Sequence, residues 1–251
     1  MIRELRTEFF KVRRRFLWLL PIGAVLMEFL WIYTNDYLRR PEVRADGYFE
    51  LIFQLAFMNT IFLPLILAAI ASRICDAENK GNTWKLLCTM QRKGRIFDAK
   101  LVMGALYILF LTVLETANMF LLARLIGVTQ ALPAAHLLIF SGVLFLVSLT
   151  IYLMQLVLSL LITSQLIPLF IGLLGSLLGV FSAFFPSDGL AAFTPWGYYM
   201  MGLTVTSVYD AEARTITLYE SSFRTGWFLF YLAAGCILYL VGKRLFLRKE
   251  V

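Results

Sequence analysis

Residues 101–123 read LVMGALYILFLTVLETANMFLLA, a block that contains one acidic residue and no Lys, Arg or His. As an α-helix this block would be about 35 Å long, and crossing the hydrocarbon core of a bilayer takes about 20 mostly apolar residues. Five further blocks have the same character. The six predicted spans are residues 16–33, 51–72, 101–123, 135–163, 166–185 and 223–242. The sequence therefore predicts an all-α membrane protein with six transmembrane helices.

The composition supports a membrane location. Hydrophobic residues make up 60% of the 251 residues and charged residues only 16%, whereas about a quarter of a typical soluble domain is charged. The six spans use most of the chain, which leaves no room for a separate soluble domain. Residues 1–251 are therefore predicted to form a single transmembrane domain.

The basic residues predict the orientation, because cytoplasmic loops carry the excess of Lys and Arg. Six spans place three basic segments on one side, and on the other side acidic residues outnumber basic ones. The basic residues of the three segments are Arg3, Arg6, Lys11, Arg13, Arg14, Arg15, Arg73, Lys80, Lys85, Arg92, Lys93, Arg95, Lys100, Lys243, Arg244, Arg248 and Lys249. Both termini are thus predicted to be cytoplasmic. The net charge of +7 then reflects topology and contact with anionic lipid, and nucleic-acid binding is not expected.

Residues 1–15 are predicted to form an amphipathic helix in the inner headgroup layer. An apolar residue recurs at intervals of three and four, which places these side chains on one helical face. They are Ile2, Leu5, Phe9, Val12 and Phe16. The alternative is a cytoplasmic start of the first span with scattered arginines. A cleaved signal peptide is disfavoured, because the apolar run is too long and no small-x-small cleavage site follows it.

The outer segment 186–222 is the longest outer loop. Its first half is apolar but too short to span, and it contains Pro195, Trp196, Tyr198 and Tyr199. Trp and Tyr are enriched at membrane–water interfaces, so a re-entrant or interfacial helix is predicted there. Residues 205–219 are rich in Thr, Val, Ile and Tyr and are consistent with a small hairpin.

Motifs of catalysis and metal binding are missing from the sequence. It contains no phosphate-binding loop, no H-E-x-x-H, no paired Cys-x-x-Cys and no G-x-S-x-G. The single histidine, His136, cannot form a metal cluster, and Cys75, Cys88 and Cys236 do not suggest a disulfide framework. We expect no enzymatic activity, no metal site and no cofactor bound by this chain.

The cytoplasmic loop 73–100 is the most informative segment. A short helix there would carry Trp84, Leu86, Leu87 and Met90 as an apolar face on a charged element, with a break at Gly94 before the third span. On a chain without ATPase motifs, such a loop suggests a docking surface for a separate protein. The alternative is a solvated interfacial loop.

Polar side chains inside the spans form a second group of candidates. Glu28, Glu115 and Asn118 are costly in lipid and should face protein or water. They would line a pathway for a cationic peptide, or they would bond neighbouring helices. Small residues from Gly172 to Gly179 allow close helix packing, either within the subunit or with a second subunit.

Residues 76–90, DAENKGNTWKLLCTM, resemble the coupling segment of ABC-2-type transporter permeases. In that family an acidic residue and a glycine precede a helix with a Leu-Leu pair, and a Thr-Pro-like exit and basic residues follow. The matching residues are Glu78, Gly81, Leu86, Leu87 and Thr89, with Trp84 inside the helix. Met90 stands where the family often has proline. The six spans, the inner termini and the N-terminal helix extend the resemblance over the whole chain.

Within the family, the string Thr194-Pro195-Trp196-Gly197-Tyr198 resembles the lantibiotic-immunity permeases of Gram-positive bacteria. The resemblance implies a second permease subunit, the same or homologous, and two P-loop ATPase subunits that bind ATP and Mg. It implies export of an antimicrobial peptide from the bacterial cytoplasmic membrane. Export of another amphipathic drug or a lipid, and a sensor or scaffold without transport, are the alternatives.

Overall fold

The computed structural model describes residues 2–13, 15–35, 38, 40–81, 83–184, 192–210 and 215–249. The helices are α1 (Ile2–Arg13), α2 (Leu19–Tyr33), α3 (Pro41–Arg44), α4 (Gly47–Gly81), α5 (Trp84–Met90), α6 (Lys93–Ile126), α7 (Ala134–Leu161), α8 (Leu166–Phe184), η2 (Pro195–Gly197), α10 (Tyr198–Met201) and α11 (Thr225–Arg248). The strands β1 (Val205–Asp210) and β2 (Thr215–Glu220) pair antiparallel. This confirms the predicted hairpin.

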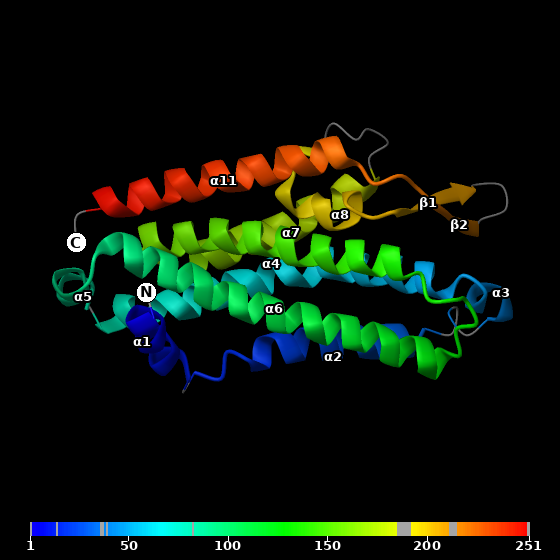
Figure 1. Cartoon of the computed structure of the whole chain (residues 1–251), viewed down its shortest axis with the longest axis horizontal. Coiled ribbons are helices and arrows are strands. Elements are labelled where there is room, and N and C mark those ends of the chain that lie inside the picture. The colour runs from blue at the N-terminus through cyan, green and yellow to red at the C-terminus, as the bar shows by residue number, and fades with distance from the viewer. Residues whose placement is uncertain are drawn as a thin grey trace.

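The long helices run along the longest axis of the molecule, side by side (Figure 1). Helices α1 and α5 and the last turns of α11 lie at one end of the bundle, and α3 and the hairpin β1–β2 lie at the other. The first and last helices therefore end on the same side, as the basic residues predicted. We call these the cytoplasmic end and the outer end.

Four of the described helices are long and apolar enough to cross a membrane: α4, α6, α7 and α11. Two shorter apolar helices, α2 and α8, accompany them. The chain is thus a helical membrane protein with several apolar helices, and the count of six spans stays a prediction.

Helix α4 is longer than the predicted second span. It runs without a break over 35 residues, from Gly47 to Gly81, and carries Glu78 on its last turns. Helix α6 begins at Lys93, so Gly94 lies inside its first turn, and the chain is extended at Gln91 instead (φ −138°, ψ 147°). The segment 73–100 is therefore the end of α4, the short helix α5 and the start of α6.

The first span begins later than predicted. Phe16 has a left-handed backbone conformation (φ 52°), which bulky residues rarely adopt. This turn follows α1, and α2 begins only at Leu19. Helix α2 therefore has 15 residues and is about 22 Å long.

Close packing of α4 and α8 organises the outer half of the core. A Cβ at Gly172 would lie 2.9 Å from the carbonyl oxygen of Pro64, and one at Gly179 would lie 2.7 Å from Thr60. At Gly175 a Cβ would overlap the ring of Trp196. The small residues of α8 thus serve packing within the subunit, which was the first of the two interpretations.

Candidate coupling site

Helix α5 lies across the cytoplasmic end and is fixed by Trp84. The Trp84 side chain is 9% exposed; its Nε1 donates a hydrogen bond to Oδ1 of Asn79 (2.7 Å). Its ring meets Phe246 of α11 edge-on at 5.8 Å between centroids, and Nζ of Lys100 lies 5.7 Å from its centroid. One side chain therefore connects α5 with α4, α6 and α11.

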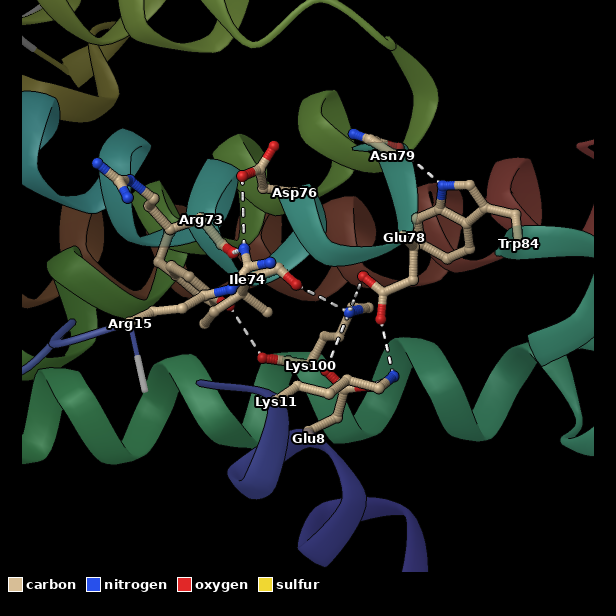
Figure 2. Close-up of polar contacts among 11 residues, drawn as sticks. Glu8, Lys11, Arg15, Arg73, Ile74, Asp76, Glu78, Asn79, Trp84 and Lys100 are labelled. Carbon is tan, nitrogen blue, oxygen red and sulfur yellow. Dashed lines mark hydrogen bonds and ion pairs between the residues drawn. The ribbon is translucent and has the colours of Figure 1, made fainter. Parts of the chain in front are cut away.

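A closed ring of ion pairs lies beneath α5 and joins α1, α4 and α6 (Figure 2). Lys11 contacts Glu8 at 2.9 Å and Glu78 at 2.8 Å. Lys100 contacts the same two carboxylates at 2.9 and 3.0 Å. We call these four residues the ion-pair ring. Two positive and two negative charges balance within it.

The ion-pair ring is largely withdrawn from solvent. The side chain of Lys100 is 0% exposed, and those of Glu8 and Glu78 are 4% and 2% exposed. Lys100 donates its third hydrogen bond to the carbonyl oxygen of Ile74 (3.0 Å), which satisfies all donors of its ammonium group. Buried charges are retained at low cost only when they are paired and hydrogen-bonded in this way.

Glu78 lies six residues beyond the predicted second span. Burial by itself raises the pKa of the Glu78 carboxyl, but the charge of Lys100 and the hydrogen bond from Lys11 more than offset burial and lower the pKa. The ionised form of Glu78 is therefore the form that the fold stabilises.

A second polar group extends the site to the α7–α8 connection. Asp76 accepts a hydrogen bond from Gln165 and pairs with Lys80 (3.1 Å) and Arg15 (3.4 Å). Arg15 also donates to the carbonyl oxygen of Arg73 (3.0 Å). The segment after α1 and the start of α8 are thus both bonded to the end of α4.

The outward face of α5 exposes two large apolar side chains beside two polar ones. Leu86 is 62% exposed and Met90 is 73% exposed, and Lys85 and Thr89 are exposed beside them. Their positions are one turn apart, so they share one face of the helix. Leu87 packs against the core instead. We call Lys85, Leu86, Thr89 and Met90 the docking face.

The structure thus divides the predicted coupling residues into two sets. Leu86 and Thr89 lie on the docking face, and Gly81 is exposed at the end of α4. Glu78, Trp84 and Leu87 face inward. A partner protein that binds here therefore meets Leu86 and Met90, and it reaches Glu78 only through the helix that carries these residues.

Glu8, Lys11 and Lys100 are the members of the site that the sequence interpretation missed. Lys11 and Lys100 were counted among the basic residues of the cytoplasmic side only. Glu4, Glu8 and Val12 lie four residues apart and are all buried, whereas Phe9 is 53% exposed and Phe16 is 60% exposed. The buried face of α1 is thus partly acidic, whereas Phe9 and Phe16 of the predicted apolar face are directed away from the bundle, where a membrane surface could contact them. The four-residue spacing of the two glutamates was the available signal.

The intramembrane candidates come together in the outer half of the bundle. Glu28 of α2 and Glu115 of α6 are both 0% exposed, and Asn118 is 5% exposed. The two carboxyl groups are close enough to interact electrostatically, and Asn59 of α4 lies beside Glu115. In this conformation they face other helices of the same chain, and their predicted role as a pathway lining stays a prediction.

Two tyrosines of the outer segment, Tyr198 and Tyr199, are also placed inside. Tyr198 and Tyr199 are 1% and 2% exposed, and Tyr199 bonds to the hydroxyl of Ser148 (2.8 Å). Trp196 lies against Gly175 and Gly179 of α8, and Pro195 opens the short helix η2. Tyr198 and Tyr199 are therefore not at the lipid–water boundary as expected, because their hydroxyl groups find partners inside the bundle.

These features define a multi-pass helical membrane protein with a buried ionic joint beneath a short cytoplasmic helix. Residues 4–179, more than half of the chain, match the family model described as ABC-2 family transporter protein. The chain belongs to this family of transporter proteins. Membership implies a place in the membrane, a transport role and a separate ABC ATPase as partner. No curated protein and no solved structure matched the chain.

Proposed function

We propose that this chain is the permease subunit of an ATP-driven exporter and that α5 is the element through which the ATPase acts. The docking face carries the proposal. It exposes two large apolar side chains, Leu86 and Met90, at the cytoplasmic end. Exposed apolar groups next to charged ones are typical of protein–protein contacts. ATP and Mg would be bound by the partner.

The ion-pair ring would transmit the movement of α5 to the spans. Trp84 ties α5 to Lys100 and Phe246, and Lys100 ties α6 to Glu78 of α4 and Glu8 of α1. Because buried ion pairs tolerate little separation, a displacement of α5 would move α1, α4 and α6 together. A chain of contacts of this kind can have two discrete arrangements, as coupling requires.

For the cargo, we propose a lantibiotic- or bacteriocin-like peptide, which the transporter removes from the bacterial (Gram-positive) cytoplasmic membrane for self-protection. The resemblance of residues 194–198 supports this. An apolar cavity of about 240 Å³ supports a lipophilic cargo more generally. It lies between α7, α10 and α11 and is lined by Ile151, Tyr198 and Phe230 among others. Another amphipathic drug or a lipid is therefore the second candidate.

The proposed assembly has two permease subunits and two ATPase subunits. Co-purification from native membranes in mild detergent tests it, with the tagged wild type and a Leu86→Ala/Met90→Ala variant. We expect an ABC ATPase to accompany the wild type and to be lost from the variant, because each substitution removes apolar area from the docking face.

A matched control is available at the same end of the molecule. Leu245 and Leu247 of α11 are each 46% exposed, and their replacement by Ala should leave the ATPase bound. If no ATPase accompanies the wild type, the sensor or scaffold function takes precedence. If the ATPase is retained by the α5 variant, the docking face is wrong and the export function still stands.

Protection assays test the cargo. Cells that lack the transporter should become sensitive to the cognate peptide and should regain resistance with the wild type. Sensitivity to lipophilic drugs instead of peptides would favour the second candidate.

A further inference from the structure

The two intramembrane glutamates are buried acidic groups without a compensating charge from the residues that the structure describes, and the coupling site does not account for them. Glu28 and Glu115 are fully enclosed, and none of their four carboxyl oxygens has a hydrogen-bond partner among the described residues. No described Lys, Arg or His forms an ion pair with either. Two bare carboxylates cannot remain together in such an environment, because each would lose its hydration without gaining a cation or a hydrogen-bond donor in exchange.

A further polar side chain is directed to the same place. Asn59 of α4 is 0% exposed, it lies beside Glu115, and neither atom of its amide has a partner among the described residues. Glu115 and Asn59 lie 11 and 12 residues from the outer ends of α6 and α4, which is about 17 Å along each helix. The unsatisfied groups therefore form one layer inside the bundle.

The groups that face the glutamates from the surrounding helices carry no compensating charge. Tyr199 of α10 is the other titratable side chain that interacts with both. Asn59 comes from α4 and Asn118 from α6. Ser148 of α7 is bonded to Tyr199. Among the described residues, the positive charge that the pair requires is therefore not supplied by the protein.

The burial of the two carboxyl groups limits which ligand can supply the compensating positive charge. The carboxyl oxygens have less than 1 Å² of accessible surface each, so a water-sized sphere does not reach them. A hydrated metal ion or a cationic side chain of a cargo peptide needs more space than that. The described part of the chain also shows no group of three or more His, Cys, Asp and Glu that could hold a metal. A proton needs no additional volume.

We propose that Glu28 and Glu115 form a proton-binding site in the membrane interior, with Asn59 as an uncharged polar neighbour. At least one carboxyl of the pair is protonated when α2 and α6 are in contact as they are here. The acidic proton then lies between the two carboxyl groups. Separation of α2 from α6 would hydrate the site and release the proton, so that proton uptake is linked to the closed arrangement of these helices. The site does not depend on the proposed export function.

Infrared spectroscopy of the full chain in a detergent without ester groups tests the proposal, because the carbonyl stretch of a protonated carboxyl group is absent from a carboxylate. We expect this band in the wild type at neutral pH, with a shift in deuterated water and a loss at alkaline pH. Glu28→Gln/Glu115→Gln should remove it. Glu78→Gln should leave it unchanged, because Glu78 is equally buried but paired with Lys100.

Two results would overturn the site. One is a wild-type spectrum without the band at neutral pH, which would mean that both glutamates are ionised. The other is a band that Na⁺ abolishes at constant pH, which would make a metal cation the ligand. If the double variant fails to fold, the wild-type titration decides the question by the same criteria. The single variants Glu28→Gln and Glu115→Gln should then change the frequency or intensity of the band, because each alters the neighbour of the remaining carboxyl group.

Discussion

Lys100 has its ammonium group enclosed between α1, α4 and α6, where it meets the carboxylates of Glu8 and Glu78. A buried ion pair adds little net stability compared with apolar residues of the same volume. Removal of one partner is different, because it leaves an uncompensated charge in place. The ion-pair ring therefore matters less for total stability than for keeping three helices in one arrangement.

Lys100→Met tests this at the residue scale. The substitution leaves Glu8 and Glu78 with only Lys11 between them, and we expect a loss of about 3–5 kcal/mol in the free energy of unfolding. Thermal unfolding in detergent measures it. Lys80→Met is the control: Lys80 pairs with Asp76, but its side chain is 75% exposed, so the loss should stay below about 1 kcal/mol. Equal effects of the two substitutions would contradict the assignment.

The pH dependence of stability follows from Glu78. Its pKa is lower in the fold than in the unfolded chain, where a Glu has a pKa of about 4.3. The stabilisation is therefore complete above that value and is lost as the pH falls through the folded-state pKa. Glu78→Gln should be less stable at neutral pH and should lose less on acidification. Parallel curves of unfolding temperature against pH for the two proteins would disprove this.

At the scale of elements, the position of η2 depends on α8. Trp196 occupies the space that side chains at Gly175 and Gly179 would fill, and the next residues bring Tyr198 and Tyr199 into the core. Helices η2 and α10 are thus packed against α8, α4 and α7. The close approach of Trp196 to α8 requires the absence of side chains at Gly175 and Gly179.

Gly175→Ala should displace Trp196 and lower the free energy of unfolding by about 1–3 kcal/mol, as overpacking does. Gly142→Ala is the matched control, because a Cβ at Gly142 of α7 would meet nothing within 4 Å. In a Trp196→Ala background, Gly175→Ala should cost less free energy of unfolding than it does in the wild type, because the ring that the new Cβ would overlap is gone. Additive losses would show that the two residues do not touch.

The apolar helices, the hairpin and the short helix α5 could be predicted from the sequence, because each has a local period or composition. The partners of charged residues could not. In the sequence, Lys100 is one of many basic residues near the predicted cytoplasmic side, and Glu8 lies among apolar residues of the first helix. Their ion pair is found only when α1 packs against α4 and α6. The burial of Tyr198 has the same origin, since the ring of Tyr231, 4.1 Å away between centroids, belongs to α11 and is brought beside Tyr198 only by the fold.

At the scale of the whole molecule, α5 and the hairpin lie at opposite ends of the bundle (Figure 1). The positive-inside rule predicts that the end with α5 is cytoplasmic. The hairpin would then face the outside, and the docking face would be available to the proposed ATPase.

Cysteine accessibility measures this topology. In a background without Cys75, Cys88 and Cys236, a cysteine at Thr89 should react with a membrane-impermeant reagent only in inverted vesicles. A cysteine at Tyr219, which is 46% exposed on β2, should react only in intact cells. Labelling of both from the same side would contradict the arrangement.

The uninterrupted length of α4 limits which insertions and deletions this helix can accept. Its 35 residues make about ten turns, and each inserted residue rotates everything beyond it by about 100°. At one end the backbone N–H of Tyr48 bonds to Gln130 (2.7 Å), and at the other Glu78 meets Lys100. A single insertion in the middle of α4 would therefore turn one of these contacts away from its partner. Length changes close to a whole number of turns, such as about seven or about eleven residues, would keep both ends in rotational phase.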